Sequence, residues 1–333
     1  MPQLPWMQLV AGLTATRPCS GQVGRLRIVS VEPSPRLDAS SWKQSGEEPD
    51  GLSAHRWLER PGDSRLWLFK AVEIKAGNRQ GEDWAEKSVA EIGGLLGIPC
   101  APIELAIRSG QEGLISRDIK PKHWDLQPGA ALLGGFVPGY DSQAKFRDGH
   151  SLANVALALR DLGAPAGYDG VASMNAYDTF CGYLLLDALV ANRDRHDHNW
   201  AVLIPPGSGQ LLLAPSFDHA SGLGFGLSDD KRLDLVKRGE VGRWVLRGTA
   251  WRFEYRQGSQ AQSLVELATS ALRAATRAAR AEWQDRFSRL SLDAVSDLLM
   301  RIQVMSVPAV TFAGELIRLN HERLLAAWDE EGG

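Results

Sequence analysis

One short polar segment, residues 192–199, holds the side chains of this chain that are best suited to chemistry; we refer to it as the polar loop. It reads Asn-Arg-Asp-Arg-His-Asp-His-Asn, with Asp194 and Asn199 five positions apart. That pair sets a carboxylate able to accept a hydroxyl proton beside an amide oxygen able to bind Mg²⁺. Phosphoryl transfer needs both groups, since the protein mainly positions the reactants and neutralises charge. The pair therefore favours a phosphotransferase.

A second carboxylate follows the polar loop at a place that suits a shared metal site. The chain is expected to form a hairpin around a Pro-Pro-Gly-Ser-Gly turn, with strands over residues 200–204 and 210–214. Asp218 comes directly after the second strand, where a second Mg²⁺ ligand is expected. Asp218 would act as the aspartate of an Asp-Phe-Gly motif, although His219 and Ala220 follow it here.

Lys70 is the cation that such a site requires. It ends the apolar run Leu-Trp-Leu-Phe-Lys of a predicted strand. In kinases, a lysine on such a strand contacts the phosphates of ATP and pairs with a glutamate on a helix. Glu86 and Glu91 both lie on that helix, but they are about 140° apart around its axis and cannot both face Lys70. A local role competes for Glu86, because Asp83 and Glu86 have the spacing of an N-cap and N3 capping box.

The polar loop and its surroundings resemble a known family. The run Asp-Arg-His-Asp-His-Asn is similar to the Asp-Arg-His-x-x-Asn loop of phosphoinositide lipid kinases and the atypical kinases related to them. The wider pattern of a helix ending at Asn192, this loop, a strand pair and Leu-Ala-Pro-Ser-Phe-Asp looks most like the HipA-like kinases. The resemblance covers roughly residues 57–226.

This resemblance implies a bilobal protein-kinase-like fold and a dependence on ATP and Mg²⁺. It makes Asp194 the base, Asn199 and Asp218 the metal ligands, and Lys70 a nucleotide contact. HipA-like kinases place the paired glutamate near the helix start, which favours Glu86. The implied acceptor is a serine or threonine hydroxyl of a protein. An antitoxin or regulatory partner, which some of these kinases have, is left open.

Short strands and one helix are expected to carry Lys70 and Glu86. The β-prone runs are residues 25–31, 54–59, 65–72, 103–107 and 113–117. The helix predicted over residues 83–97 has an apolar stripe formed by Ala85, Val89, Ile92 and Leu96. This order predicts a small sheet with one helix packed on it, an N-lobe over residues 1–120. No glycine-rich loop precedes Lys70, so residues 46–53 are the candidate cover for the phosphates.

The second part of the chain is helical by its periodicity. Helices are predicted over residues 151–162, 174–191, 261–280, 292–305 and 310–328. Together with the N-lobe they define an α+β fold of two lobes. The second lobe, over residues 121–333, carries the polar loop and Asp218. A total of 333 residues suits this division, because domains commonly have roughly 100–200 residues.

The neighbours of Asp194 in the polar loop have roles that the sequence leaves open. Arg193 and Arg195 either offset the charge of the phosphates or are simply exposed. His196 is interpreted as a residue that orders the loop by bonding to the backbone, and Asp197 as a solvated side chain.

Other functions would use the same residues. A kinase for a lipid headgroup or a small molecule needs the same groups, and so does the transfer of AMP from ATP. A metal-dependent phosphohydrolase would bind a transition metal through carboxylates and imidazoles. The residues available for that are His196, Asp197, His198, Asp218 and His219. A non-catalytic nucleotide-binding module is a further alternative.

The composition limits the setting and the partners. The net charge of −3 provides no overall basic field, so no direct binding of nucleic acid is expected. No stretch is long and apolar enough to predict a membrane span. The three cysteines are far apart and odd in number, which predicts neither a disulfide framework nor a zinc site. A cytoplasmic location is therefore expected.

Overall fold

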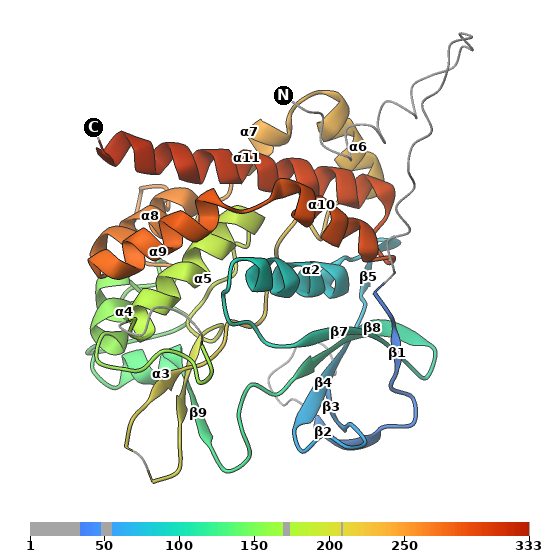
Figure 1. Ribbon diagram of the computed structural model, residues 1–333, viewed down its shortest axis with the longest axis horizontal. Coiled ribbons are helices and arrows are strands. Elements are labelled where there is room, and N and C mark those ends of the chain that lie inside the picture. Colours follow the sequence, from blue (N-terminus) through green and yellow to red (C-terminus); the bar gives the residue numbers. More distant parts are fainter. Residues whose placement is uncertain (1–33, 48–54, 169–173, 208, 333) are drawn as a thin grey trace.

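The chain folds into two lobes, a smaller one built on a β-sheet and a larger, mostly helical one (Figure 1). The computed structural model describes residues 34–47, 55–168, 174–207 and 209–332. The α+β, two-lobed fold expected from the sequence is confirmed. The strand expected over residues 25–31 lies outside the described residues, as does most of the 46–53 segment expected to cover the phosphates.

The smaller lobe contains a sheet that has six strands within the described residues, in the order β1-β7-β8-β4-β3-β2. The strands are β1 (Leu37–Asp38), β2 (Lys43–Glu47), β3 (Arg56–Glu59), β4 (Leu66–Ala71), β7 (Ile103–Arg108) and β8 (Gln111–Arg117). All neighbours pair antiparallel except β1 and β7. In β4, Trp67 and Phe69 pack with Ile115 on one face. Since successive side chains alternate, Lys70 points to the opposite face.

The helix α2 (Glu82–Leu95) covers that opposite face, close to the range predicted for it. Its apolar stripe is buried: Ala85, Val89, Ile92 and Leu96. Burial of each of the larger side chains, Val89, Ile92 and Leu96, contributes roughly 1.5–3 kcal/mol to the stability of the fold. Gly97 follows the helix in the left-handed conformation, with φ of +65°, which glycine adopts without steric cost. Helix and sheet are thus fixed to each other beside Lys70.

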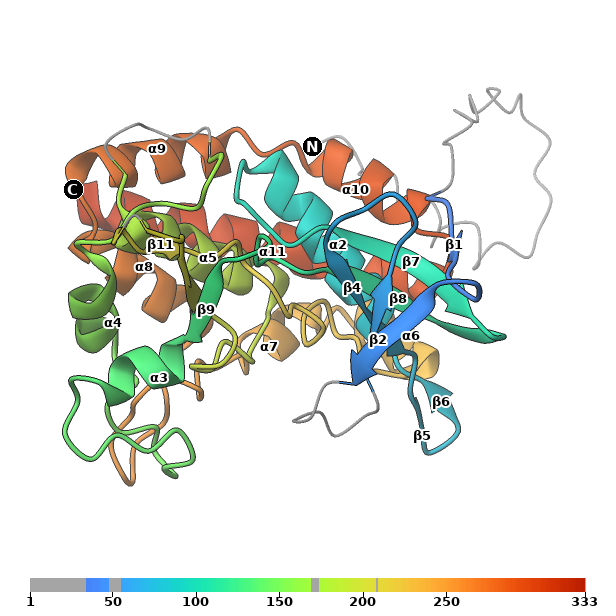
Figure 2. The ribbon, with the colours of Figure 1, turned by 90° about the horizontal axis from the view of Figure 1, so that it is seen from below.

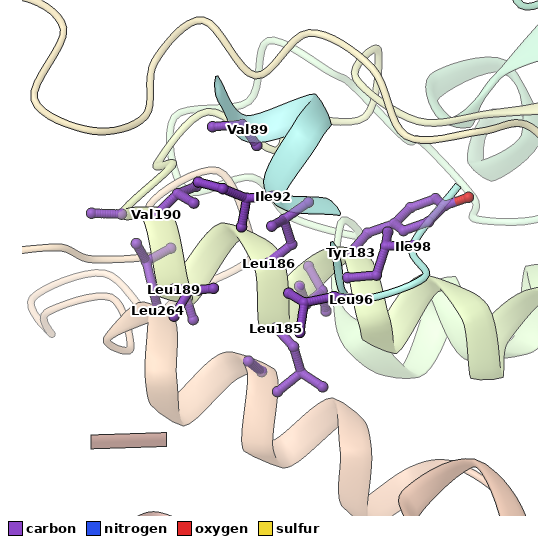
Figure 3. Close-up of a cluster of buried hydrophobic side chains, with 14 of the residues drawn as sticks. Val89, Ile92, Leu96, Ile98, Tyr183, Leu185, Leu186, Leu189, Val190 and Leu264 are labelled. Carbon is purple, nitrogen blue, oxygen red and sulfur yellow. The ribbon is translucent and has the colours of Figure 1, made fainter. Parts of the chain in front are cut away.

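The two lobes share a hydrophobic core between α2 and α5 (Ala176–Val190), shown in Figure 3. Every residue of α5 is buried, including Asp178 and Asp187, and most of the helix is apolar. Ile92 of α2 lies beside Leu186 of α5 in this core (Figure 3). Gly93 of α2 leaves room for Cys100, because a Cβ there would lie 2.6 Å from Sγ of Cys100.

The remaining helices belong to the larger lobe. They are α3 (Gly129–Gly134), α4 (Leu152–Leu159), α6 (Asp229–Lys237), α7 (Val241–Val245), α8 (Leu264–Ala274), α9 (Arg277–Ser288), α10 (Leu292–Arg301) and α11 (Val307–Gly332). The prediction of one helix over residues 261–280 is wrong, because the chain breaks there into α8 and α9. Ala275 is extended, and Thr276 caps α9 by accepting the backbone N–H of Ala279 at 3.2 Å. Across the described residues, no helix is long and apolar enough to cross a membrane.

The C-terminal helices reach over to the smaller lobe and hold α2 from its outer side (Figures 1 and 2). α10 packs directly against α2. Arg286 of α9 donates to the backbone oxygens of Leu96 at 3.3 Å and Gly97 at 2.9 Å. Ser88 Oγ of α2 lies 3.7 Å from Sδ of Met305, just before α11. The helix is therefore fixed on both sides, by the sheet and by the end of the chain.

A small antiparallel sheet lies beside the polar loop. In the described part of the chain its strands are β11 (Leu212–Leu213), β10 (Ala201–Ile204) and β9 (Asp125–Pro128), and a separate hairpin pairs β5 (Ile74–Lys75) with β6 (Asn78–Arg79). The predicted hairpin is confirmed as β10 and β11, whereas β9 was not predicted. Half-buried Ile119 and Phe217 pack against apolar clusters of both this sheet and the larger one. They join the lobes immediately next to Asp218.

Candidate active site

Arg195 holds the polar loop in place and is only 3% exposed. It makes a bidentate ion pair with Asp187 of α5, with Nε–Oδ2 at 2.7 Å and Nη2–Oδ1 at 2.9 Å. It also donates to the backbone oxygen of Asn199 at 2.7 Å and to Oγ of Ser216 at 3.0 Å. One guanidinium thus joins α5, the loop and the strand that leads to Asp218. Of the two roles considered for Arg195, that of an exposed side chain is wrong.

Most other side chains of the polar loop also support its conformation. Asp197 is buried and accepts a hydrogen bond from the Tyr140 hydroxyl at 2.6 Å, so the expectation that it is solvated is wrong. His196 Nδ1 accepts the backbone N–H of His198 at 3.2 Å, in keeping with a loop-ordering role. Burial lowers the pKa of His196, which favours its neutral form. Arg193 is exposed.

Asp194 and Asn199 are linked directly, because Nδ2 of Asn199 donates to the backbone oxygen of Asp194 at 2.8 Å. This leaves the side-chain oxygen of Asn199 without a donor among the described residues. The Asp194 carboxylate is 29% exposed, and its Oδ1 accepts from Nε of Arg252 at 2.6 Å. No described residue donates to its Oδ2. One carboxylate oxygen therefore remains available to a hydroxyl group.

Lys70 lies between two carboxylates that come from distant parts of the chain. Its Nζ is 3.5 Å from Oε2 of Glu86 and 3.0 Å from Oδ1 of Asp218. The Glu86 side chain is 1% exposed and that of Asp218 is 37% exposed. Glu91 points elsewhere and pairs with Lys87 at 2.9 Å. The structure brings Glu86, and not Glu91, to Lys70.

The capping-box role considered for Glu86 is wrong. α2 has Gly81 as its N-cap with no side-chain hydrogen bond there, so Glu86 is the fifth residue of the helix and too far along for N3. Asp83, the proposed cap, pairs instead with Arg79 at 2.7 Å. The Glu86 carboxylate is therefore left to Lys70.

The two carboxylates beside Lys70 respond differently to their surroundings. The charge of Lys70 lowers the pKa of Asp218 to about 2, so this group is ionised near neutral pH. Burial raises the pKa of Glu86, and the charge of Lys70 opposes that rise. The chain turns sharply at Asp218, whose φ of +59° lies in the left-handed region that aspartate adopts more readily than most residues.

The oxygens of Asn199 and Asp218 fit Mg²⁺. This ion prefers carboxylate and amide oxygens and keeps several waters, so two protein ligands are enough. No described residue donates a hydrogen bond to the side-chain oxygen of Asn199. The charged carboxylate of Asp218 is partly exposed. In the parts of the chain that the structure describes, no group of three or more His, Cys, Asp or Glu side chains could hold a metal. His219, expected as one ligand of a transition metal, is buried and lies 2.7 Å from Oγ of Ser216.

Arg252 belongs to the site but was not indicated by the sequence. It comes 58 residues after Asp194, in the irregular segment between α7 and α8. No motif surrounds it, and no helical or strand periodicity points it at the polar loop. Tyr140, 57 residues before its partner Asp197, was missed for the same reason. Only the folding of the larger lobe brings these side chains to the loop.

Comparisons with known proteins identify the fold but not the protein. No family model matches the sequence, and no curated protein matches it. Among solved structures, the chain is similar to the crystal structure of the Helicobacter pylori proinflammatory kinase CtkA, with a TM-score of 0.69 and 15% identity over 88% of this chain and 96% of that chain. It also matches a structure of the Shewanella oneidensis MR-1 toxin–antitoxin system of HipA, HipB and operator DNA, with a TM-score of 0.49 and 13% identity over 97% of this chain and 71% of that chain.

The likeness to CtkA confirms the kinase-like fold that the sequence predicted. At 15% identity the similarity to CtkA concerns the fold. One fold can carry several activities, so the reaction has to be argued from the residues of the site.

Proposed function

We propose that this protein is a kinase that depends on ATP and Mg²⁺ and transfers the γ-phosphate to a hydroxyl group, with a serine or threonine of a protein as the acceptor. The kinase-like fold supports the proposal. So do the contacts of Lys70 with Asp218 and of Asn199 with Asp194, since Arg195 binds the backbone next to both pairs, at Asn199 and Phe217.

The position of Lys70 is the observation that carries the proposal. Its ammonium group is held by Glu86 from α2 and by Asp218 from a point 148 residues further along the chain. Two carboxylates fix the place of the ammonium group, which is what a cation that must meet the α- and β-phosphates requires.

The other residues fall into roles that complete the reaction. Asn199 and Asp218 would hold Mg²⁺, and this ion would neutralise charge on the phosphates. Asp194 would take the proton of the acceptor hydroxyl at Oδ2, the oxygen that no described residue occupies. Glu86 would keep Lys70 in position.

Two half-buried apolar side chains close to Asp218 would contact the base of ATP. Half-buried Ile119 and Phe217 contact clusters of both lobes, and Phe217 directly precedes Asp218. An aromatic ring and a branched aliphatic side chain at such a junction offer faces on which a purine can stack. The phosphates would then extend toward Lys70 and Asp218.

The test of this proposal uses ATP labelled at the γ-phosphate and, separately, at the α-phosphate. The wild type, Asp194→Asn and a matched control, Asp161→Asn, are incubated with Mg²⁺ and protein, phosphoinositide or small polyol acceptors. Asp161 is an exposed aspartate in the same lobe. We expect transfer from the γ-position by the wild type and the control, and a loss of about 10²-fold or more in Asp194→Asn, the usual contribution of a general base.

The same experiment separates the alternatives. Transfer to a lipid or a polyol alone would change the acceptor and leave the reaction as proposed. Label transferred only from the α-phosphate would make the protein a nucleotidyltransferase. If calorimetry detects no Mg²⁺-dependent binding of ATP, the protein is not a kinase.

A further inference from the structure

Arg252 is a cation in the candidate active site that none of the roles above uses. It belongs to the segment between α7 and α8, and its side chain is 23% exposed. Its Nε lies 2.6 Å from Oδ1 of Asp194, the shortest ion-pair contact that Asp194 makes to a described residue. A charged side chain this close to the proposed base must influence the transfer step or block it.

The position of Arg252 is fixed by contacts on several sides. Its guanidinium lies over the ring of Trp251, 3.9 Å from the ring centre. Its backbone oxygen is 2.7 Å from Nδ1 of His150, whose ring stacks on Phe253 at 4.4 Å between centres. Nε2 of the same histidine accepts from Trp200 at 3.2 Å. Arg252 is therefore held in a defined place, as an arginine that must meet a ligand should be.

The terminal nitrogens of the Arg252 guanidinium are suited to bind an anion. Nε is used by Asp194, but no described residue accepts a hydrogen bond from either terminal nitrogen of Arg252. Two parallel N–H groups of arginine match two oxygens of a phosphate. Because Arg252 occupies only Oδ1 of Asp194, it leaves Oδ2 to the acceptor hydroxyl and does not block it.

Two other cations described at the site are already held by carboxylates. Lys70 is engaged by Glu86 and Asp218, on the side of the proposed α- and β-phosphates. Arg195 is buried against Asp187. Arg252, in contact with the proposed base, is placed to stabilise charge during transfer.

We propose that Arg252 is a catalytic residue: its terminal nitrogens bind the γ-phosphoryl group during transfer while its Nε holds Asp194. This inference rests on the proposed kinase activity. In the step, the acceptor oxygen forms a bond to the γ-phosphorus, and its proton passes to Oδ2 of Asp194. The bond from the γ-phosphorus to the bridging oxygen breaks, and its electron pair leaves on ADP. Arg252 stays protonated throughout.

The test compares Arg252→Ala and Arg252→Lys with Arg256→Ala, a control that removes an exposed arginine from the same segment. We expect kcat to fall about 10²-fold or more in Arg252→Ala, since arginines that stabilise this transition state contribute about 10³–10⁵-fold. The KM for ATP should stay nearly unchanged, Arg252→Lys should keep an intermediate rate, and millimolar guanidinium should restore part of the activity of Arg252→Ala.

A second measurement does not depend on turnover. ADP with aluminium fluoride mimics the phosphoryl group in transfer, so Arg252→Ala should bind this mimic more weakly than the wild type and bind ADP alone equally well. Equal losses for both, or no loss, would show that Arg252 does not touch the phosphoryl group. A kcat of Arg252→Ala close to that of the wild type would have the same meaning.

The outcomes also separate this inference from the proposed function. If the wild type transfers γ-phosphate and Arg252→Ala does so equally well, only the role of Arg252 is rejected. If the wild type neither binds ATP nor transfers phosphate, the kinase proposal is rejected and the role of Arg252 with it.

Discussion

Nζ of Lys70 lies 3.0 Å from Oδ1 of Asp218, although the two residues are 148 positions apart in the chain. Lys70 comes from the middle of the sheet in the smaller lobe, and Asp218 follows the hairpin of the larger lobe. With Glu86 on the other side, the lysine links both lobes through charge. The stability of the protein and its proposed activity should therefore both depend on this contact, but in different ways.

Replacing Lys70 by Met should cost stability as well as activity. It leaves the Glu86 carboxylate buried without its cation, and breaking a buried ion pair costs about 3–5 kcal/mol, or less here because Asp218 is partly exposed. Adding Glu86→Gln should recover most of the stability and none of the phosphate transfer. Urea unfolding measures the first effect and labelled ATP the second. Lys75→Met, at an exposed pair, serves as the control and should change stability by less than about 1 kcal/mol. Equal unfolding of all three variants contradicts this account.

Glu86 and Glu91 offer a matched pair for the role of the helix glutamate. Glu86→Gln should lower kcat/KM for ATP about tenfold or more, equivalent to about 1.4 kcal/mol, because Lys70 loses one of its two anchors. Glu91→Gln disturbs only the pair with Lys87 on the other side of α2 and should leave kcat/KM close to that of the wild type. Steady-state kinetics with varied ATP decides; similar losses in both variants would mean that the pairing of Lys70 is unimportant.

The effects of replacing Arg195 and Asp187 on the free energy of unfolding should be coupled. Arg195→Ala should lower the free energy of unfolding by about 3–5 kcal/mol, since it strands a buried carboxylate. Asp187→Ala should do likewise, and the double variant should lose clearly less than the sum of the two. Arg289→Ala, at an exposed pair, is the control. Additive losses in the double-mutant cycle would contradict the coupling.

His150 should make the folded protein less stable in acid. Burial lowers the pKa of His150 from 6.5 to about 4, so in that window the unfolded chain binds a proton that the folded protein does not. The free energy of unfolding therefore falls as the pH falls, by up to about 1.4 kcal/mol per pH unit from this residue. In His150→Gln the slope should be shallower by that amount, as urea unfolding at several pH values would reveal. A curve for His150→Gln that runs parallel to that of the wild type would exclude the effect.

Much of the fold could be predicted because its signals are local. The stripe from Ala85 to Leu96 marks α2 to within two residues at each end, and the Pro-Gly turn marks the hairpin of β10 and β11. The helix break at Thr276 was missed because an N-cap threonine in the middle of a regular periodicity resembles an ordinary helical residue. The short strand β9 was missed because it is stabilised by pairing with β10, where Leu126 lies opposite Leu203, 77 positions further along the chain, and not by its own sequence.

The candidate site divides in the same way. The interval from Asp194 to Asn199 can be read within one loop, and Lys70 can be read from one strand. The buried position of Arg195 could not be predicted, because it depends on contacts with Asp187 and Ser216 from other parts of the chain. The contact of Arg252 with Asp194 was the hardest to predict, because only the path of the chain between α7 and α8 brings the two residues together.

The packing of α10 and Arg286 against α2 has a consequence for shortened forms of the chain. A protein cut after Ser288 would still contain Lys70, Glu86, Asp194 and Asn199, and a search for these motif residues would score it as intact. It would nevertheless lack α10 and α11, and with α10 the surface on which α2 rests opposite the sheet. The glutamate that steadies Lys70 is thus seated by helices that begin about 200 positions later in the chain. Possession of the motif and possession of a working site are separate properties in this protein.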